Sequence, residues 1–305
     1  MDRALLDFFN RSLARSWLDG PMVVLTVFGL LLVPVIAWWP RRRRTADARA
    51  LSNAALLAML IGVVAAVVVQ LFVDRARPAD VRLVLAQPAL FPSFPSGHVA
   101  AAMAVALVLL LGRATRRLGV AASLLAGLLG LSRVYLGHHF PSDVLGGAML
   151  GAGIGASCHG LFARAGEPAR WRWLLFGHLA AMAVVTQMAY LGLVPSLPSI
   201  VYIDKIGHLL FFGIATFLLD PWFAPQRRWL YVPPAIALPF CAGFVEEMLQ
   251  MLSPYRTCDV LDLTADLVGM LAFFALSRLL RARLWRGSGS QSDQSPAQQP
   301  PSIAA

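Results

Sequence analysis

Nine separate apolar runs dominate this chain, and they determine the kind of fold it can adopt. They lie roughly at 21–39, 50–73, 96–112, 118–135, 143–163, 173–194, 207–223, 229–251 and 260–280. An α-helix needs about 20 predominantly apolar residues to cross a hydrocarbon core about 30 Å thick. Of the 305 residues, 58% are hydrophobic and 14% are charged, whereas about a quarter of the residues of a soluble domain are charged. The sequence therefore predicts an all-α, polytopic membrane protein with about nine transmembrane helices, and it argues against a soluble enzyme.

The two ends of the chain follow different patterns. Near the N-terminus, Leu6, Phe9, Leu13 and Trp17 recur at helical spacing between polar residues, which is typical of an amphipathic helix lying in the membrane interface. This segment lacks the continuous apolar region and the small-residue cleavage site of a signal peptide. Residues 287–305 contain little apolar sequence, so we expect a disordered tail there.

The distribution of positive charge predicts how the chain is oriented in the membrane. If every connection alternates sides, most of the 26 Lys and Arg residues fall in one set of loops, and such loops are usually cytoplasmic. The net charge of +10 is then a topology signal, and we expect no nucleic-acid partner. The basic residues of these loops are Arg41 to Arg44, Arg49, Arg113, Arg116, Arg117, Arg164, Arg170, Arg172, Arg227, Arg228, Arg278, Arg281, Arg283 and Arg286.

The opposite set of loops holds nearly all the polar residues that suggest chemistry. These loops are residues 74–80, 91–98, 132–143, 201–208 and 253–262. Ionisable side chains at a membrane are costly without a partner or a role, so this clustering predicts a functional site on the extracytoplasmic side. Cys158, Cys241 and Cys258 form no pair or His/Cys cluster, so we expect neither a metal site nor a cofactor.

Three polar segments in the first half suit phosphoryl chemistry. Arg77 precedes Pro78, and Arg133 ends the fourth apolar run; two guanidinium groups can bind one phosphate from different directions. Ser96 and Gly97 open the third run, where backbone N–H groups at a helix start form an anion site.

Two histidines in these segments suit catalysis. Asp143 follows His139 by four residues, so its carboxylate would accept the imidazole N–H and leave the other nitrogen free to attack phosphorus. His98 would protonate the leaving oxygen as a general acid.

These residues resemble the three-part signature of the type 2 phosphatidic-acid phosphatase superfamily: K-x6-R-P, P-S-G-H and S-R-x5-H-x3-D. Residues 95–98 and 132–143 keep the second and third parts without change, whereas Gln70 stands where the first part has lysine. The resemblance implies a phosphohistidine on His139, with Asp143 as its orienting partner, His98 as the acid and no metal. It also implies phosphate binding by Arg77, Ser96, Gly97 and Arg133. Gln70 and Arg75 are additional candidates for phosphate contacts.

The arrangement of the first two runs is also similar to that of the bacitracin-resistance type of undecaprenyl-pyrophosphate phosphatase. This resemblance covers about residues 1–165. It implies a hydrolase in a bacterial-type plasma membrane that dephosphorylates undecaprenyl pyrophosphate, or a related lipid phosphate, at the extracytoplasmic face. Two alternatives stay open. One is a protein that binds or translocates a carrier lipid without turnover, and the other is a lipid phosphotransferase.

A second polar group lies in the last four apolar runs. It consists of Asp204, Lys205, His208, Glu247, Gln250, Arg256, Asp259, Asp262 and Asp266. Residues 259, 262 and 266 would share one helix face, with Lys205, His208 and Arg256 as natural partners. The group resembles the VanZ-like family, which is associated with glycopeptide resistance. An internal ion-pair network that joins four helices is an equally good interpretation.

The composition changes at residues 165–173. We therefore predict a phosphatase-like membrane domain at 1–166, a VanZ-like four-helix membrane domain at 170–286 and a cytoplasmic tail at 287–305. One hypothesis is that the second domain holds a polyprenyl carrier beside the phosphatase site. The oligomeric state stays open.

Overall fold

The computed structural model of the chain is helical in almost every described segment. The described residues are 1–87, 91–162, 167–193, 203–223, 229, 231–251 and 259–289. Within these ranges, extended pairing is limited to an isolated bridge between Trp229 and Val232. The prediction of an all-α fold is confirmed. The predicted tail falls largely outside the described residues.

The long helices follow the predicted apolar runs. They are α2 (Ser16–Trp38), α3 (Ala46–Val73), α4 (Gly97–Leu111), α5 (Arg116–Tyr135), α6 (Pro141–Phe162), α7 (Glu167–Tyr190), α8 (Ile203–Leu219), α9 (Pro234–Gln250) and α10 (Val260–Gly289). A short helix α1 (Asp2–Asp7) precedes them, followed by a π-helical turn at Phe8–Ser12. Short 3₁₀ turns lie at Trp39–Arg43, Arg113–Thr115 and Asp220–Trp222.

Many of these helices are long enough to cross a membrane. Among the described residues, six helices combine sufficient length with sufficient hydropathy, and they lie in α2, α3, α5, α6, α7 and α10. Helix α4 is apolar but has 15 residues, and α8 and α9 have 17 residues each. The chain is therefore a multi-pass membrane protein, and the count of nine crossings stays a prediction.

The chain divides into two compact units. The first contains Met1–Ile203 and Val245–Asp259, and the second contains Asp204–Phe244 and the described residues from Val260 onward. Helix α7 packs against α6 and so lies in the first unit. The boundary between the two packed units, after Ile203, therefore comes later in the chain than the predicted domain boundary at 166–170. The predicted boundary rests on motifs and composition.

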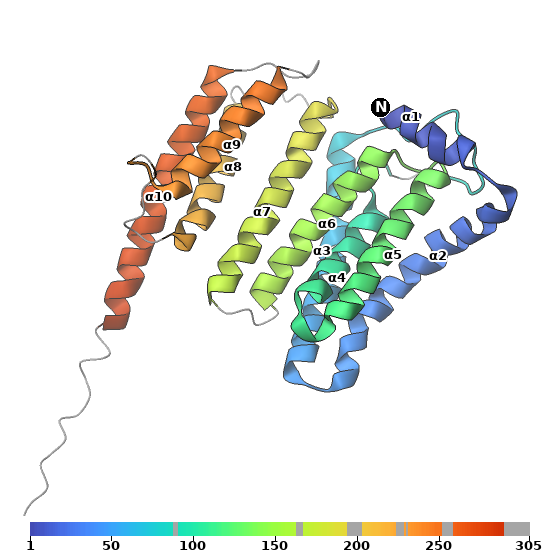
Figure 1. The fold of residues 1–305 in the computed structure, drawn as a ribbon, viewed down its shortest axis with the longest axis horizontal. Coiled ribbons are helices and arrows are strands. Elements are labelled where there is room, and N and C mark those ends of the chain that lie inside the picture. The colour runs from blue at the N-terminus through green and yellow to red at the C-terminus, as the bar shows by residue number, and fades with distance from the viewer. Residues whose placement is uncertain are drawn as a thin grey trace, which may run out of the picture. The chain divides into compact units, whose positions relative to one another are not determined.

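Helix α4 occupies the centre of the first unit (Figure 1) and packs against α3, α5 and α6. Its buried positions include Ala100, Ala101, Ala102, Ala104 and Ala106, so small side chains occupy several sides of the helix. A helix that is apolar all round is stable when other helices surround it. The alanines let those neighbours approach closely, and this packing holds the first turn of α4 in place relative to α3, α5 and α6.

Glycines in α6 make the closest of these approaches. Gly147, Gly151 and Gly155 are spaced four apart, so they share one face of the helix. A Cβ atom on Gly151 would lie 2.3 Å from the carbonyl oxygen of Ala100 in α4. A Cβ atom on Gly147 would lie 2.5 Å from the carbonyl oxygen of Ser96. Small residues at this spacing allow close packing of membrane helices, and here they bring the first turns of α4 and α6 together.

The N-terminal segment is helical, as predicted, but its polar side is partly buried. Leu6 and Asn10 are both fully buried, so a polar side chain of this segment points into the protein. The Asn10 Nδ2 atom donates to the carbonyl oxygens of Tyr135 at 2.7 Å and Arg82 at 2.9 Å, and the Arg82 N–H donates back to Oδ1 at 2.8 Å. The apolar side chain of Trp17 stays exposed, which leaves it available to the membrane interface.

We expect Gly151→Val to destabilise the protein by about 1–3 kcal/mol, because the added side chain forces α6 away from the α4 backbone. The loss would appear as a lower thermal unfolding temperature of the purified protein in detergent. Gly127→Ala in α5 is the matched control, since a Cβ atom there meets nothing within 4 Å. Equal unfolding temperatures for the Gly151 variant and the control would contradict close α4–α6 packing.

Candidate active site

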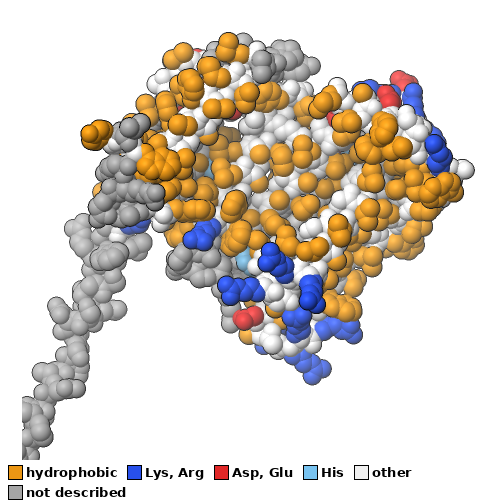
Figure 2. Space-filling view, in the orientation of Figure 1, with side chains coloured by type: hydrophobic (Ala, Val, Ile, Leu, Met, Phe, Trp, Pro, Cys, Tyr) orange, Lys and Arg blue, Asp and Glu red, His pale blue; other side chains and the backbone are white. Residues whose placement is uncertain are grey.

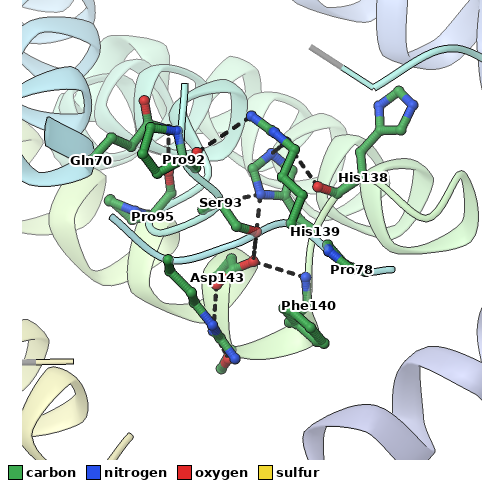
Figure 3. Close-up of polar contacts among 12 residues, drawn as sticks. Gln70, Pro78, Pro92, Ser93, Pro95, His138, His139, Phe140 and Asp143 are labelled. Atoms are coloured by element: carbon green, nitrogen blue, oxygen red, sulfur yellow. Dashed lines mark hydrogen bonds and ion pairs between the residues drawn. The ribbon is translucent and has the colours of Figure 1, made fainter. Parts of the chain in front are cut away.

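The carboxylate of Asp143 joins the polar segments that the sequence singled out. It is fully buried at the start of α6. Its Oδ1 atom accepts a hydrogen bond from Arg75 Nη1 at 2.5 Å. Its Oδ2 atom accepts one from the Phe140 N–H at 2.8 Å and another from the Ser93 hydroxyl. Its main-chain oxygen accepts from the Ser96 N–H at 2.9 Å. One residue therefore fixes the segments before α4 and α6 relative to each other (Figure 3).

The imidazole of His139 is buried and held in one orientation. Its Nδ1 atom lies 2.8 Å from the carbonyl oxygen of Ser93 and 3.6 Å from Asp143 Oδ2. Because a carbonyl oxygen can only accept a hydrogen bond, Nδ1 carries the proton. The Nε2 atom is then unprotonated, and it faces Arg77 Nη1 at 3.4 Å. The sequence predicted that Asp143 accepts the hydrogen bond from the imidazole N–H, whereas the Ser93 carbonyl oxygen makes the shorter contact with Nδ1.

The surroundings of His139 keep its ring neutral. Burial, the largest effect, lowers the pKa of His139 from 6.5 to about 4. The hydrogen bond and the charge of Asp143 act in the opposite direction, and the charge of Arg133 adds to the lowering. A neutral imidazole with a free nitrogen is the form that can act as a nucleophile.

Two guanidinium groups lie near this nitrogen, and their charges are poorly compensated. Arg133 is 3% exposed; its Nη1 atom donates to the Thr26 hydroxyl at 3.3 Å, and its Nε atom has no partner. Arg77 donates to the carbonyl oxygens of His138 at 2.8 Å and Phe91 at 3.1 Å. Among the residues that the structure describes, no carboxylate forms an ion pair with either arginine. Buried unpaired cations are costly, so an anion would stabilise this site.

The first turn of α4 completes the candidate site. Ser96 is fully buried at the position before the helix, and its hydroxyl has no partner among the described residues. Gly97 begins the helix. The Ser96 N–H donates to the Asp143 carbonyl oxygen, and Arg77 faces His139, so residues from all three motif segments lie close together.

Gln70 and Arg75, the other two candidates for phosphate contacts, bind protein groups. Gln70 is buried, and its Nε2 atom donates to the carbonyl oxygen of Pro95 at 2.8 Å. Arg75 contacts Asp143, as described, and also Ser142 Oγ at 2.7 Å and Asp2 Oδ2 at 2.8 Å. Gln70 therefore holds the segment before α4, and Arg75 holds the carboxylate beside His139.

Several residues of the site were not singled out by the sequence. Ser93 lies three residues before Ser96, in the same polar segment. Asp2 accepts from the Ser142 N–H at 3.0 Å and from the Ser142 hydroxyl at 2.5 Å, so the N-terminal helix caps the start of α6. Gln187 in α7 donates to the Ser142 carbonyl oxygen at 2.8 Å. Spacing around the known motifs could have indicated Ser93, but nothing local links Asp2 or Gln187 to the site.

Several residues of the second polar group form acid–base pairs in the second unit. Lys205 Nζ contacts Asp262 Oδ1 at 2.5 Å, and His208 Nδ1 contacts Asp266 Oδ1 at 3.0 Å. Asp204 contacts the same lysine at 3.0 Å. These pairs join α8 to α10, as expected for an internal ion-pair network.

Three further members of this group lie in the first unit. Gln250 Nε2 donates to Glu246 Oε2 at 2.6 Å and to Glu247 Oε1 at 3.1 Å. The Asp259 N–H donates to Glu247 Oε2 at 3.0 Å. Arg256 falls outside the described residues.

Comparisons with protein families agree with the two groups of motifs. Residues 53–167 match the PAP2 superfamily model, and residues 164–281 match the VanZ/LLP1 model. The chain thus joins a PAP2-type segment to a VanZ-type segment, which confirms the prediction of a fusion. The catalytic and binding roles of individual residues stay predictions.

Individual relatives cover parts of the chain. Undecaprenyl-diphosphatase BcrC of Bacillus subtilis (strain 168) is 38% identical over 63 residues, which are 21% of this chain and 32% of the relative. The chain thus spans about a third of the length of this curated relative.

Two solved structures are also similar to the chain. LpxE of Aquifex aeolicus is 28% identical, with a TM-score of 0.44, over 51% of this chain and 93% of that structure. A transmembrane PAP2-type phosphatidylglycerolphosphate phosphatase from Bacillus subtilis is 29% identical, with a TM-score of 0.43, over 52% and 83% respectively.

We expect the His139 ring to titrate near pH 4, because its folded-state pKa is about 4. Above that pH the ring is neutral, and it gains a proton only as the pH falls through this value. NMR of the protein labelled at histidine carbons would give the midpoint, with the signal assigned by its loss in His139→Gln. Asp143→Asn should lower the midpoint further, because it removes a hydrogen bond and a charge that favour the imidazolium. A midpoint near 6.5 would show that burial does not control this group. A rise in Asp143→Asn would show that Asp143 does not favour the charged ring.

Proposed function

We propose that the protein is a membrane lipid phosphatase whose nucleophile is His139, and that its substrate is undecaprenyl pyrophosphate or a closely related lipid phosphate. One observation carries the proposal. A neutral imidazole presents its free Nε2 atom to Arg77 Nη1 at 3.4 Å, and the charge of the buried Arg133, which forms no ion pair among the described residues, acts on the same ring. This arrangement suits a bound phosphate with phosphorus in front of the nucleophile.

The donors around Nε2 would hold the phosphate oxygens. Arg77 and Arg133 supply guanidinium N–H groups, and the first turn of α4 supplies backbone N–H groups at Ser96 and Gly97. The unpartnered Ser96 hydroxyl is a further donor. These groups stabilise the charge that develops on the phosphate oxygens in the transition state.

The reaction would then proceed in two displacements. In the first, His139 Nε2 attacks the terminal phosphorus, the bond from phosphorus to the leaving oxygen breaks, and His98 protonates that oxygen. The Nδ1 proton stays on the ring and donates to the Ser93 carbonyl, while Asp143 stabilises the positive charge that forms on the imidazole.

In the second displacement, water attacks the phosphohistidine and releases phosphate. His98, which lost its proton in the first step, accepts one from the water. With undecaprenyl pyrophosphate, the products are undecaprenyl phosphate and inorganic phosphate, and both histidines return to their starting states.

The lipid and the side of the membrane are inferred from separate observations. The relative with 38% identity over 63 residues is described as an undecaprenyl-diphosphatase. The basic residues Arg41 to Arg44, Arg113, Arg116 and Arg117 lie in the connections, or in the first turn of α5, at the end of these helices opposite the candidate site. By the positive-inside rule, we infer that the site faces the extracytoplasmic side. The basic residues Arg278, Arg281, Arg283 and Arg286 near the end of α10 support a cytoplasmic C-terminal tail by the same rule.

For the organisation of the chain, we propose that residues 1–166 carry the phosphatase and that residues 170–286 form the VanZ-like domain. Helix α7, which packs on α6, would connect the two. The contact from Gln187 to Ser142 supports a structural influence of this helix on the start of α6.

We expect His139→Ala to abolish phosphate release from undecaprenyl pyrophosphate in proteoliposomes, because it removes the Nε2 atom that forms the bond to phosphorus. A rate at least about 10³-fold below that of the unaltered protein is expected for loss of a covalent nucleophile. Phosphatidylglycerophosphate and phosphatidic acid, assayed in parallel, would identify the preferred lipid. The control is His178→Ala in α7, which replaces a histidine outside the motif segments.

Three results would overturn parts of this proposal. Unchanged release by the His139 variant would exclude the nucleophile assignment. A phosphorylated lipid acceptor in place of free phosphate would show a phosphotransferase, and tight lipid binding without turnover would show a binding protein.

We expect Arg75→Gln to reduce kcat about 10- to 100-fold with little change in KM, because it leaves the buried Asp143 carboxylate without its cationic partner. Steady-state rates of phosphate release would test this expectation. Arg75→Lys should restore part of kcat, since it keeps a positive charge beside Asp143. If KM rises and kcat stays unchanged, Arg75 binds the substrate phosphate directly.

A further inference from the structure

A second basic region lies at the far end of the first unit. A hollow of about 890 Å³ opens between the connection from α2 to α3 and the connection from α4 to α5. Arg42, Arg43, Arg113, Arg116 and Arg117 line it, together with Trp39. Figure 2 shows Lys and Arg side chains gathered at this end, next to a largely hydrophobic surface. The phosphatase reaction proposed above uses none of these residues.

The hollow is open to an anion because nothing acidic lines it. None of the described residues that surround it is Asp or Glu. Arg43 Nη1 donates to the Ala114 carbonyl oxygen at 2.8 Å, and this bond joins the two connections. The Arg42 guanidinium lies 4.4 Å from the centre of the Trp39 ring. Arg42 and Arg43 are thus held at the hollow by neutral partners, which leave their charge uncompensated.

The start of α5 adds backbone donors to the same hollow. Residues 116–118, its first turn, line it. Thr115 precedes the helix but makes no side-chain cap, because its hydroxyl donates to the carbonyl oxygens of Leu109 at 2.7 Å and Gly112 at 3.2 Å. The first N–H groups of a helix are without partners inside the helix and attract anions.

The surroundings of the hollow indicate a lipid. Trp39 and Val120 line it and are 49% and 48% exposed, and Leu124, one turn further along α5, is 66% exposed. Exposed apolar side chains on membrane-spanning helices face acyl chains. Aromatic residues such as Trp39 are common at the level of lipid headgroups. A ligand with a phosphate headgroup and acyl chains would contact both surfaces.

We propose that this hollow binds the headgroup of an anionic phospholipid in the leaflet opposite the phosphatase site. The five arginines and the first turn of α5 bind the phosphate, and the acyl chains lie along α2 and α5. Helix α5 has 20 residues and therefore separates this site from Arg133 by nearly the full length of the helix, about 30 Å. The site is thus independent of the proposed phosphatase reaction.

Native mass spectrometry of the full-length protein in detergent would test the proposal, with phosphatidylglycerol as the probe. We expect Arg116→Gln with Arg117→Gln to weaken phosphatidylglycerol binding about 30-fold, since each of the two basic residues near the anionic lipid contributes roughly 1 kcal/mol. Arg116→Lys with Arg117→Lys should retain most of the binding. Phosphate release by His139 should continue in both variants, which shows that they are folded.

The matched control is Arg44→Gln with Arg49→Gln. It removes the same charge from the end of the connection before α3 and from the first turn of α3, but neither residue lines the hollow. We expect less than a twofold change in this control.

Three results would overturn the proposal. An equal loss in the lining and control variants would show general attraction by the basic loops. Equal binding of phosphatidylcholine would show that headgroup charge is not recognised. Displacement of phosphatidylglycerol by inorganic phosphate at the same concentration would show that the ligand is a free phosphate ion.

Discussion

The buried carboxylate of Asp143 is the interaction on which the candidate site depends. Its side chain accepts hydrogen bonds from Arg75, Ser93 and the Phe140 N–H, and its main-chain oxygen accepts from the Ser96 N–H. A buried charge is stable only when it is paired and hydrogen-bonded. The requirement to satisfy this one group therefore fixes three segments that are far apart in the sequence, and the orientation of His139 follows from it.

Close helix packing makes this arrangement possible. The glycine face of α6 lets the backbone of α4 approach so closely that a Cβ atom on Gly147 would lie 2.5 Å from the Ser96 carbonyl oxygen. Membrane helices gain little from hydrophobic association in lipid, so van der Waals packing of small residues is what holds them together. The site lies at the ends of these tightly packed helices, which gives it a rigid base.

Charge is distributed between the two ends of the first unit for different reasons. At one end, Arg77 and Arg133 are buried or half-buried beside a neutral imidazole, where they can bind the phosphate that reacts. At the other end, five arginines surround an open hollow with exposed apolar side chains beside it. In the two functions proposed above, the same residue type serves catalysis where it is buried and lipid contact where it is exposed. The net charge of +10 reveals neither role by itself.

The sequence by itself determined the all-helical membrane fold, the positions of the long helices and the identity of the motif residues, because hydropathy and motif spacing are local properties. Only the tertiary structure decided their partners. His139 Nδ1 contacts the Ser93 carbonyl, 46 residues away, more closely than Asp143. Arg75 binds Asp143 instead of remaining free for phosphate, and Asp2 caps a helix that begins 139 residues later, at Pro141. Such contacts depend on how helices pack, and local spacing carries no record of that packing.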